Sequence, residues 1–409
     1  MTPADPPPSP ESRVAYLDCL RGLAAVSVVL AHIVRNLLLP YNTLPNGEWL
    51  QQLVYHSPFY LFIHSAISVK LFFMISGFSL SYPILMNHGS HKIRQMALYR
   101  IFRLGVPMIF SALLIYAFLK MELYSTNEAF ALVKQRWLLR LSNFEPNLTD
   151  AVFGTIIRFL LNIPSDFPRY NNVFWTMPIE FAASMSLFAL QFMFARQALW
   201  IRSLVYLVLT ILLWKSLYLG FVLGAALCDW TIHLQPQERL KRLLSPTALS
   251  GIEIAIIALF LAFFSALRLF PRFGSILEYH ILDGNVLEYL LALTILVVAS
   301  LRNHLHAWIT TPFIRYLGKI SFSLYLVHIP ILASFSCWLF VTLHAWIDHQ
   351  IVIAILVLTT SLPLIVLVSH LFHHLVEIRT LNWIKTRITR PSNAPCRRHV
   401  TRSSGSGSV

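Results

Sequence analysis

The sequence has few charged residues. Only 12% of its 409 residues are charged, whereas 56% are hydrophobic, and the mean hydropathy is +0.64. Soluble domains are about 25% charged and 45–50% apolar, so this composition excludes an ordinary soluble protein. The chain has only four cysteines, and none falls in a loop expected on the extracytoplasmic side, so we expect no disulfide. The alternation typical of a transmembrane β-barrel is also missing, which leaves helices as the spanning elements.

Ten apolar stretches are long enough, or nearly so, to cross a membrane as helices. They lie at roughly residues 14–38, 58–86, 96–122, 174–196, 199–214, 216–230, 251–270, 286–301, 314–340 and 350–376. The fifth, sixth and eighth of these stretches are short for a span. The sequence therefore predicts an all-α, polytopic transmembrane helical bundle of about ten helices.

The positive charges give this bundle an orientation. The formal net charge is +14, but lysine and arginine concentrate in alternate loops, and loops 39–57 and 341–349 contain neither. Positively charged loops mark the cytoplasmic side of a membrane protein, so both termini are predicted to be cytoplasmic. The basic excess is thus a topology signal that also suits contact with membrane lipid, and we expect no nucleic-acid partner.

The sequence divides into three parts. Residues 1–13 are proline-rich, lack a signal-peptide pattern and are expected to form a disordered cytoplasmic leader. Residues 14–385 form the transmembrane domain, with an extracytoplasmic loop region at 123–173 whose aromatic residues suggest part of an acceptor site. Residues 386–409 form a basic, Ser/Gly-rich cytoplasmic tail.

Ionisable residues inside the spans are the strongest functional signal. Arg21 and His32 lie in the first apolar stretch, where an ionised side chain at mid-depth costs about 2.5–3.5 kcal/mol. By the predicted topology Arg21, Arg100 and Arg103 lie near the cytoplasmic face. His32 is about 16 Å further out, and Glu180 is predicted to lie at the same level.

This division suits a transfer reaction across the membrane. Guanidinium groups on the cytoplasmic side can hold the phosphates of a donor, and imidazole can take a proton from an acceptor hydroxyl on the far side. A carboxylate such as Glu180 can orient the imidazole. We therefore expect His32 and the arginines to line one continuous internal passage. No serine or cysteine stands out as a nucleophile, so direct transfer and an acyl-enzyme both stay open.

Structural interpretations of the same residues also stay open. Arg21 can brace its own helix by pairing with Asp18, and the two later arginines can be interfacial anchors. His328 is as well explained by packing as by catalysis. The histidines of the last span crowd together, but no cysteine or carboxylate cluster accompanies them, so we expect no metal site.

At these residues the chain resembles the acyltransferase 3 family of integral membrane acyltransferases. The matching motifs occur in the family's order: Asp18 and Arg21 with His32 in the first span, Phe72-Phe73-Met-Ile-Ser76-Gly77-Phe78, Arg100 with Arg103, Trp175-Thr176 with Glu180, and Ser321-Phe322-Ser323-Leu-Tyr325-Leu-Val-His328. A final glutamate of the family corresponds to Glu377, but the proline-aromatic pair that usually follows it is absent. The resemblance covers most of residues 14–385.

The resemblance implies a membrane-bound O-acyltransferase. It implies an acyl-CoA co-substrate, with acetyl-CoA expected, no tightly bound cofactor, and a glycan or lipid-linked sugar as acceptor. It places the protein in a membrane as a multi-pass protein, with the bacterial inner membrane expected. His32 and Glu180 are then the expected catalytic residues and Arg21, Arg100 and Arg103 the donor-binding ones. The expected supporting residues are Asp18, Ser76, Gly77, Trp175, Thr176, Tyr325 and His328.

One rival hypothesis comes from another class of protein. A proton-coupled transporter could use His32 and Glu180 as a proton relay within the membrane. Such a protein predicts inverted repeats with paired broken helices, and the sequence shows neither. The residues alone fix neither the acceptor nor the oligomeric state.

Overall fold

The computed structural model describes residues 10–39, 54, 57–87, 90–161, 169–235, 239, 243–269, 284–300 and 304–387. In these residues every secondary-structure element is helical. The α-helices are α1 (Pro10–Ile33), α3 (Ser65–Asn87), α4 (Ser90–Lys120), α5 (Thr126–Val133), α6 (Arg136–Leu139), α7 (Thr155–Leu161), α8 (Thr176–Phe194), α9 (Leu199–Leu212), α10 (Tyr218–Leu234), α12 (Pro246–Leu269), α14 (Gly284–Ser300), α15 (His304–Ile309), α16 (Pro312–Ile331), α17 (Cys337–His344), α18 (Gln350–Phe372) and α19 (Ile378–Arg387). Short π or 3-10 turns are η1 (Val34–Leu38), η2 (Pro58–Ile63), η3 (Asp150–Gly154), η4 (Asn172–Trp175), η6 (Leu332–Ser336) and η7 (His373–Glu377). Most of the predicted leader and tail lies outside the described residues.

The helices confirm an all-α membrane bundle, with fewer full-length spans than predicted. Six segments are long and apolar enough to cross a membrane: Tyr16–Leu38, Ser65–Met86, Ile93–Lys120, Asn172–Phe194, Pro312–His344 and Gln350–Arg387. Four shorter apolar helices coincide with the fifth to eighth predicted spans: Leu199–Leu212, Tyr218–Leu234, Thr247–Leu259 and Val286–Ser300. The predicted count of ten is thus met by six long spans and four short helices within the described residues.

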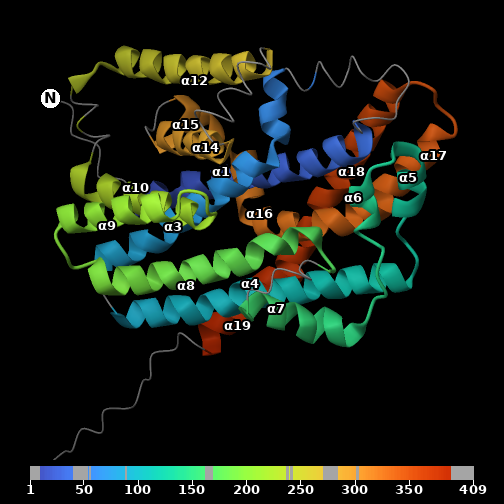
Figure 1. The fold of residues 1–409 in the computed structure, drawn as a ribbon, viewed down its shortest axis with the longest axis horizontal. Helices are drawn as coiled ribbons and strands as arrows, with labels where there is room; N and C mark the ends of the chain where they lie inside the picture. The colour runs from blue at the N-terminus through green and yellow to red at the C-terminus, as the bar shows by residue number, and fades with distance from the viewer. Residues whose placement is uncertain are drawn as a thin grey trace, which may run out of the picture.

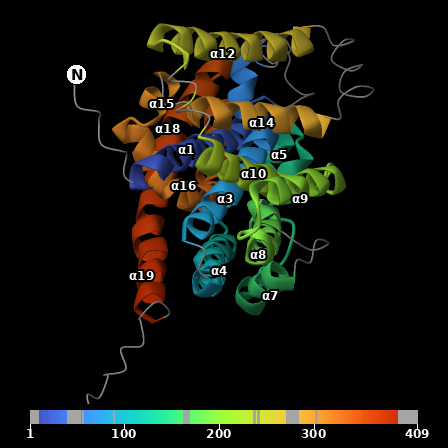
Figure 2. The same cartoon turned by 90° about the vertical axis from the view of Figure 1, so that its left-hand side faces the viewer.

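Helix α1 lies inside the bundle, with α16 and α3 beside it (Figure 2). The closest approach of α1 and α16 is at Gly22 and Gly318. A Cβ atom on Gly22 would lie 2.5 Å from the backbone nitrogen of Gly318, which leaves no room for a side chain. Small residues allow such close helix packing in membranes. This crossing fixes the height of α16 relative to α1.

Helices α3 and α10 pack in the same way. Gly220 and Gly224 form a G-x-x-x-G pair on α10, and a Cβ atom on either would overlap α3 at Phe73 or Met74. A Cβ atom on Gly77 would overlap the carbonyl of Phe221. Gly77 thus allows α3 and α10 to approach closely.

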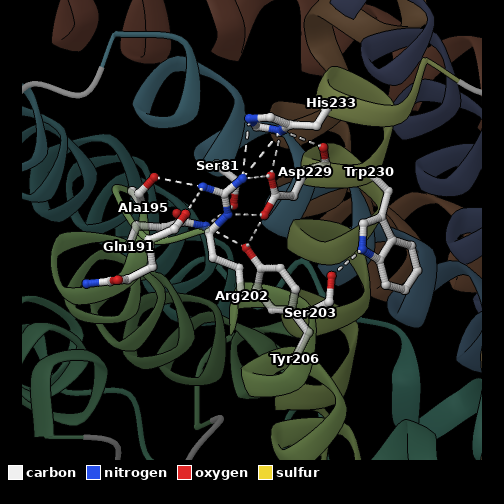
Figure 3. A network of polar contacts seen from close by, with 10 residues as sticks. Ser81, Gln191, Ala195, Arg202, Ser203, Tyr206, Asp229, Trp230 and His233 are labelled. Atoms are coloured by element: carbon white, nitrogen blue, oxygen red, sulfur yellow. Dashed lines mark hydrogen bonds and ion pairs between the residues drawn. The ribbon is translucent and has the colours of Figure 1, made fainter. Parts of the chain in front are cut away.

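A buried polar network joins α9 and α10 at one end of the bundle (Figure 3). The guanidinium of Arg202 binds both carboxylate oxygens of Asp229, at 2.7 and 2.9 Å. Its remaining terminal nitrogen donates to the carbonyls of Ala195 and Gln197 at 3.0 and 2.8 Å. His233 Nδ1 lies 2.9 Å from the same carboxylate. Because the buried charges compensate each other, this network serves as a brace between helices.

The opposite end of the bundle holds α5, α6 and α17 (Figure 1). Here the chain that leads into α8 is buried. The side-chain amide of Asn171 donates to Ser111 Oγ at 3.0 Å and to the carbonyl of Leu326 at 2.7 Å, and its oxygen accepts from the backbone of Val173 at 3.3 Å. Thr176, the first residue of α8, is buried as well. The start of α8 is therefore packed against α4 and α16.

Candidate functional site

One cavity lies between α1, α3, α4, α8 and α16. Its volume is about 100 Å³. The cavity is lined by Arg21, Val69, Phe72, Phe73, Ser76, Arg100, Arg103, Leu104, Thr176, Met177, Glu180, Ser321, Phe322 and Tyr325. Seven of the residues that the sequence singled out are among them, drawn from five helices. The fold thus brings together most of the predicted site.

The centre of the cavity is a buried ion pair between Arg100 and Glu180. The same carboxylate oxygen accepts a hydrogen bond from Ser76 Oγ at 2.6 Å. Arg100 Nε also donates to Ser184 Oγ at 3.0 Å, and this hydroxyl donates to the carbonyl of Glu180 at 2.6 Å. Charges buried together in this way hold each other in place. Glu180 is therefore committed to Arg100.

The predicted partnership of Glu180 with His32 is wrong in this structure. Glu180 instead contacts Arg100 and Ser76, which places it at the arginine cavity.

Two more arginines give the cavity a positive balance. Arg21 donates to Asp18 at 2.8 Å and to Ser79 Oγ at 3.2 Å. The guanidinium of Arg103 lies over the ring of Tyr99, 5.9 Å from its centroid. Three guanidinium groups thus face two carboxylates, which leaves one positive charge for an anion.

The two histidines meet each other beyond this cavity. His32 Nδ1 lies 3.0 Å from His328 Nε2, and His328 Nδ1 lies 3.1 Å from the carbonyl oxygen of Leu324. A carbonyl only accepts, so in the neutral ring the proton of His328 is on Nδ1 and its Nε2 is an acceptor. His32 must then donate from Nδ1. Its own Nε2 keeps a lone pair, which is what a general base needs.

The predicted continuous passage is only partly present. His32 is not among the residues that line the cavity. The connection runs through aromatic rings: the ring of Tyr325 lies 6.0 Å from that of His328, and the ring of His328 lies 5.1 Å from that of His32. Tyr325 itself shares a 2.9 Å hydrogen bond with Thr176 Oγ1. Tyr325 therefore separates the basic cavity from the histidine pair.

The aromatic residues of the predicted acceptor loop have different surroundings. The ring of Trp137 stacks on His32, with centroids 5.2 Å apart and planes 14° from parallel. Phe144 packs edge-on against Tyr170, whose hydroxyl donates to the carbonyl of Asn147 at 2.5 Å. Burial raises the pKa of Tyr170, which keeps this hydroxyl protonated as a donor. Only Trp137 of these three reaches the histidine pair.

The other predicted residues lie at the edge of the site or brace it. Trp175 is exposed and does not line the cavity. Glu377, whose role the sequence left open, accepts from Ser323 Oγ at 2.9 Å and pairs with His373 Nδ1 at 2.8 Å, so it fixes the last span to α16. Within the described residues no cluster of three metal-ligating side chains occurs.

Sequence reasoning missed two contacts of the site. Ser184 lies one helical turn after Glu180, and that spacing could have indicated a shared partner. The stacking of Trp137 on His32 joins residues far apart in sequence, and no local pattern announces it.

A buried charged cavity and a histidine pair inside a bundle of long apolar helices are typical of a multi-pass membrane protein. Residues 14–369 match the family model described as acyltransferase domain, acyltransferase 3. The chain belongs to the acyltransferase 3 family, and it is an acyltransferase.

Two further comparisons bear on this assignment. The chain is similar to the O-acetyltransferase PaAT-1 of Phomopsis amygdali, with 24% identity over 366 residues, which cover 78% of this chain and 72% of that protein. No solved structure matches the chain.

Proposed function

We propose that this acyltransferase moves an acetyl group from acetyl-CoA, bound from the cytoplasmic side, to a hydroxyl of an extracytoplasmic glycan or lipid-linked sugar. The observation that carries the proposal is the hydrogen-bonded pair of His32 and His328, which leaves His32 Nε2 as a base. The arginine cavity next to it supports an anionic donor. The name of PaAT-1 as an O-acetyltransferase supports an acetyl group.

The arginines would bind the donor unequally. Arg103 would contact the phosphates of the donor, with Arg21 beside it, because Arg100 is paired with the buried Glu180 whereas Arg21 is paired with the exposed Asp18. Glu180 would act through Arg100, as a positioning residue of the donor cavity.

The transfer step would balance as follows. His32 Nε2 takes the proton of the acceptor hydroxyl while that oxygen attacks the thioester carbonyl. The new carbon–oxygen bond forms, the carbon–sulfur bond breaks, and the electron pair leaves on the sulfur of CoA. The imidazolium then returns the proton to this thiolate. Tyr325, which lines the cavity and contacts His328, would turn its hydroxyl from Thr176 to donate a hydrogen bond to the carbonyl oxygen.

The proposal is tested with membranes that contain the protein and [14C]acetyl-CoA. Label that mild alkali releases as acetate reports O-acetyl esters. We expect His32→Ala to abolish this label, because it removes the imidazole that takes the proton of the acceptor hydroxyl. His349→Ala removes an exposed histidine on the same side and should leave the label unchanged. Normal label in the His32→Ala protein would overturn the assignment of the base.

A further inference from the structure

The segment between α4 and α7 forms a fixed cap over the outer end of the bundle. The backbone nitrogen of Ser125 donates to the carbonyl of Ala333 at 3.0 Å, which ties the start of α5 to η6, the turn that follows α16. The hydroxyls of Thr126 and Ser142 lie 2.7 Å apart and close the segment on itself. Its apolar side chains are buried, namely those of Ala129, Val133, Leu138 and Leu141. We call residues 125–142 the outer cap.

The outer cap places one side chain on the proposed base. The indole of Trp137 lies against the His32 ring in an offset stack, with centroids 5.2 Å apart and planes only 14° from parallel. His328 occupies the Nδ1 edge of the same ring. An acceptor hydroxyl must therefore approach along the edge that carries Nε2. Both Trp137 and His32 are half-buried, so the pair lies at the boundary between the cap and the bundle.

We propose that Trp137 is a positioning residue for the acceptor step. This inference rests on the proposed function, because it needs His32 as the base. The indole holds the imidazole plane in the orientation that points Nε2 at the acceptor hydroxyl. A misplacement of about 1 Å in such a geometry can cost about a hundredfold in rate.

The indole of Trp137 also stabilises the positive charge that the proton transfer creates on His32. When His32 takes the proton it becomes an imidazolium, and the face of an indole attracts a cation that lies on it. The same face covers the ring against water. Without the indole, water could reach Nε2 and attack the thioester, giving acetate and free CoA thiol in place of the ester. Trp137 should therefore decide how much of the donor is transferred and how much is hydrolysed.

A merely structural role predicts a different outcome. If Trp137 only packs the outer cap, its loss lowers the amount of folded protein and leaves each folded molecule with a normal ratio of ester to free thiol. If Trp137 positions the base, the ratio itself changes. The Michaelis constant for acetyl-CoA should stay the same, because the arginine cavity is on the other side of Tyr325.

The experiment compares Trp137→Ala, Trp137→Phe and Trp346→Ala, each normalised to monodisperse protein. Trp346 is 85% exposed on the same side of the bundle and serves as the matched control. Membranes with [14C]acetyl-CoA give the ester label, and a thiol reagent gives total CoA release. In Trp137→Ala we expect the ratio of ester label to CoA released to fall about tenfold or more. Trp137→Phe, which keeps an aromatic face, should stay within about threefold of the wild type.

Two results would overturn the inference about Trp137. One is an unchanged ratio of ester to thiol in Trp137→Ala, and the other is an equal loss in the alanine and phenylalanine variants. Failure of the proposed function looks different, since the wild-type protein would then form no alkali-labile label at all.

Discussion

His32 and His328 lie 3.0 Å apart, Nδ1 to Nε2, and each follows by ten residues the glycine at which its helix crosses the other. Gly22 in α1 touches Gly318 in α16, and both helices run in the same direction from there. At 1.5 Å per residue the two histidines stand about 15 Å above the crossing, at equal height. The helix crossing therefore sets the register that pairs the two rings.

The first prediction concerns Nε2 of His328, the atom that accepts the hydrogen bond from His32. His328→Gln keeps an oxygen that accepts the proton of His32 Nδ1, whereas His328→Phe keeps only the volume. We expect the phenylalanine variant to lose about a hundredfold or more of the transfer rate, because His32 is then free to adopt the wrong tautomer. The glutamine variant should retain a measurable part of the transfer rate. Initial rates of ester formation from [14C]acetyl-CoA measure both.

The comparison between these two variants decides the role of His328. Equal rates in His328→Gln and His328→Phe would mean that the hydrogen bond to His32 does not matter to the reaction. A purely packing role for His328 would also leave the phenylalanine variant with near-normal rates.

The second prediction concerns the buried pair of Arg100 and Glu180. Removing one partner of a buried ion pair leaves an uncompensated charge and costs about 3–5 kcal/mol. We expect Glu180→Gln to lower the midpoint of thermal unfolding of the purified protein, followed by tryptophan fluorescence. The double variant Arg100→Gln, Glu180→Gln should recover part of the loss, since both charges are then gone. Neither variant should bind the donor normally.

A control for this prediction is Arg169, whose guanidinium lies 3.3 Å from Asp150 and is half exposed. An exposed ion pair contributes about 0–1 kcal/mol, so Arg169→Gln should hardly move the midpoint. A wild-type midpoint in the Glu180→Gln protein would show that the carboxylate is not needed to compensate Arg100.

Much of the site could be predicted because membrane depth constrains ionisable residues so strongly. Arg21, Arg100 and Arg103 were assigned to one side from loop charges and motif order, and the structure places all three on one cavity. The pairing of Glu180 could not be predicted in the same way. The pairing of Glu180 with Arg100 joins α8 to α4, and the periodicity of either helix alone does not indicate it.

The contacts that join distant segments were beyond sequence reasoning for a different reason. Trp137 reaches His32 because the outer cap folds back onto the bundle. The backbone hydrogen bond from Ser125 to Ala333 helps to hold the cap there. The periodicity of apolar residues describes one helix at a time. It does not indicate which distant segment packs against that helix. The crossing of Gly22 and Gly318 is also invisible in either helix alone, because each glycine has its partner in the other.

The third prediction tests that crossing directly. A Cβ atom on Gly22 would lie 2.5 Å from the nitrogen of Gly318 and 2.7 Å from the carbonyl carbon of Leu317, and backbone atoms cannot move aside without shifting a whole helix. Gly22→Ala should therefore separate α1 from α16, pull His32 away from His328 and reduce both thermal stability and ester formation.

Gly251 provides the matched control for Gly22→Ala, because a Cβ atom on Gly251 would have no neighbour within 4 Å. Gly251 lies within α12, where alanine is favoured over glycine by about 1 kcal/mol, so Gly251→Ala should keep full activity and equal or higher stability. Thermal midpoints and rates of ester formation, measured on the same preparations, separate the two variants. Wild-type rates in the Gly22→Ala protein would mean that the pairing of the two histidines does not depend on this crossing. The link between helix packing and the proposed base would then be lost.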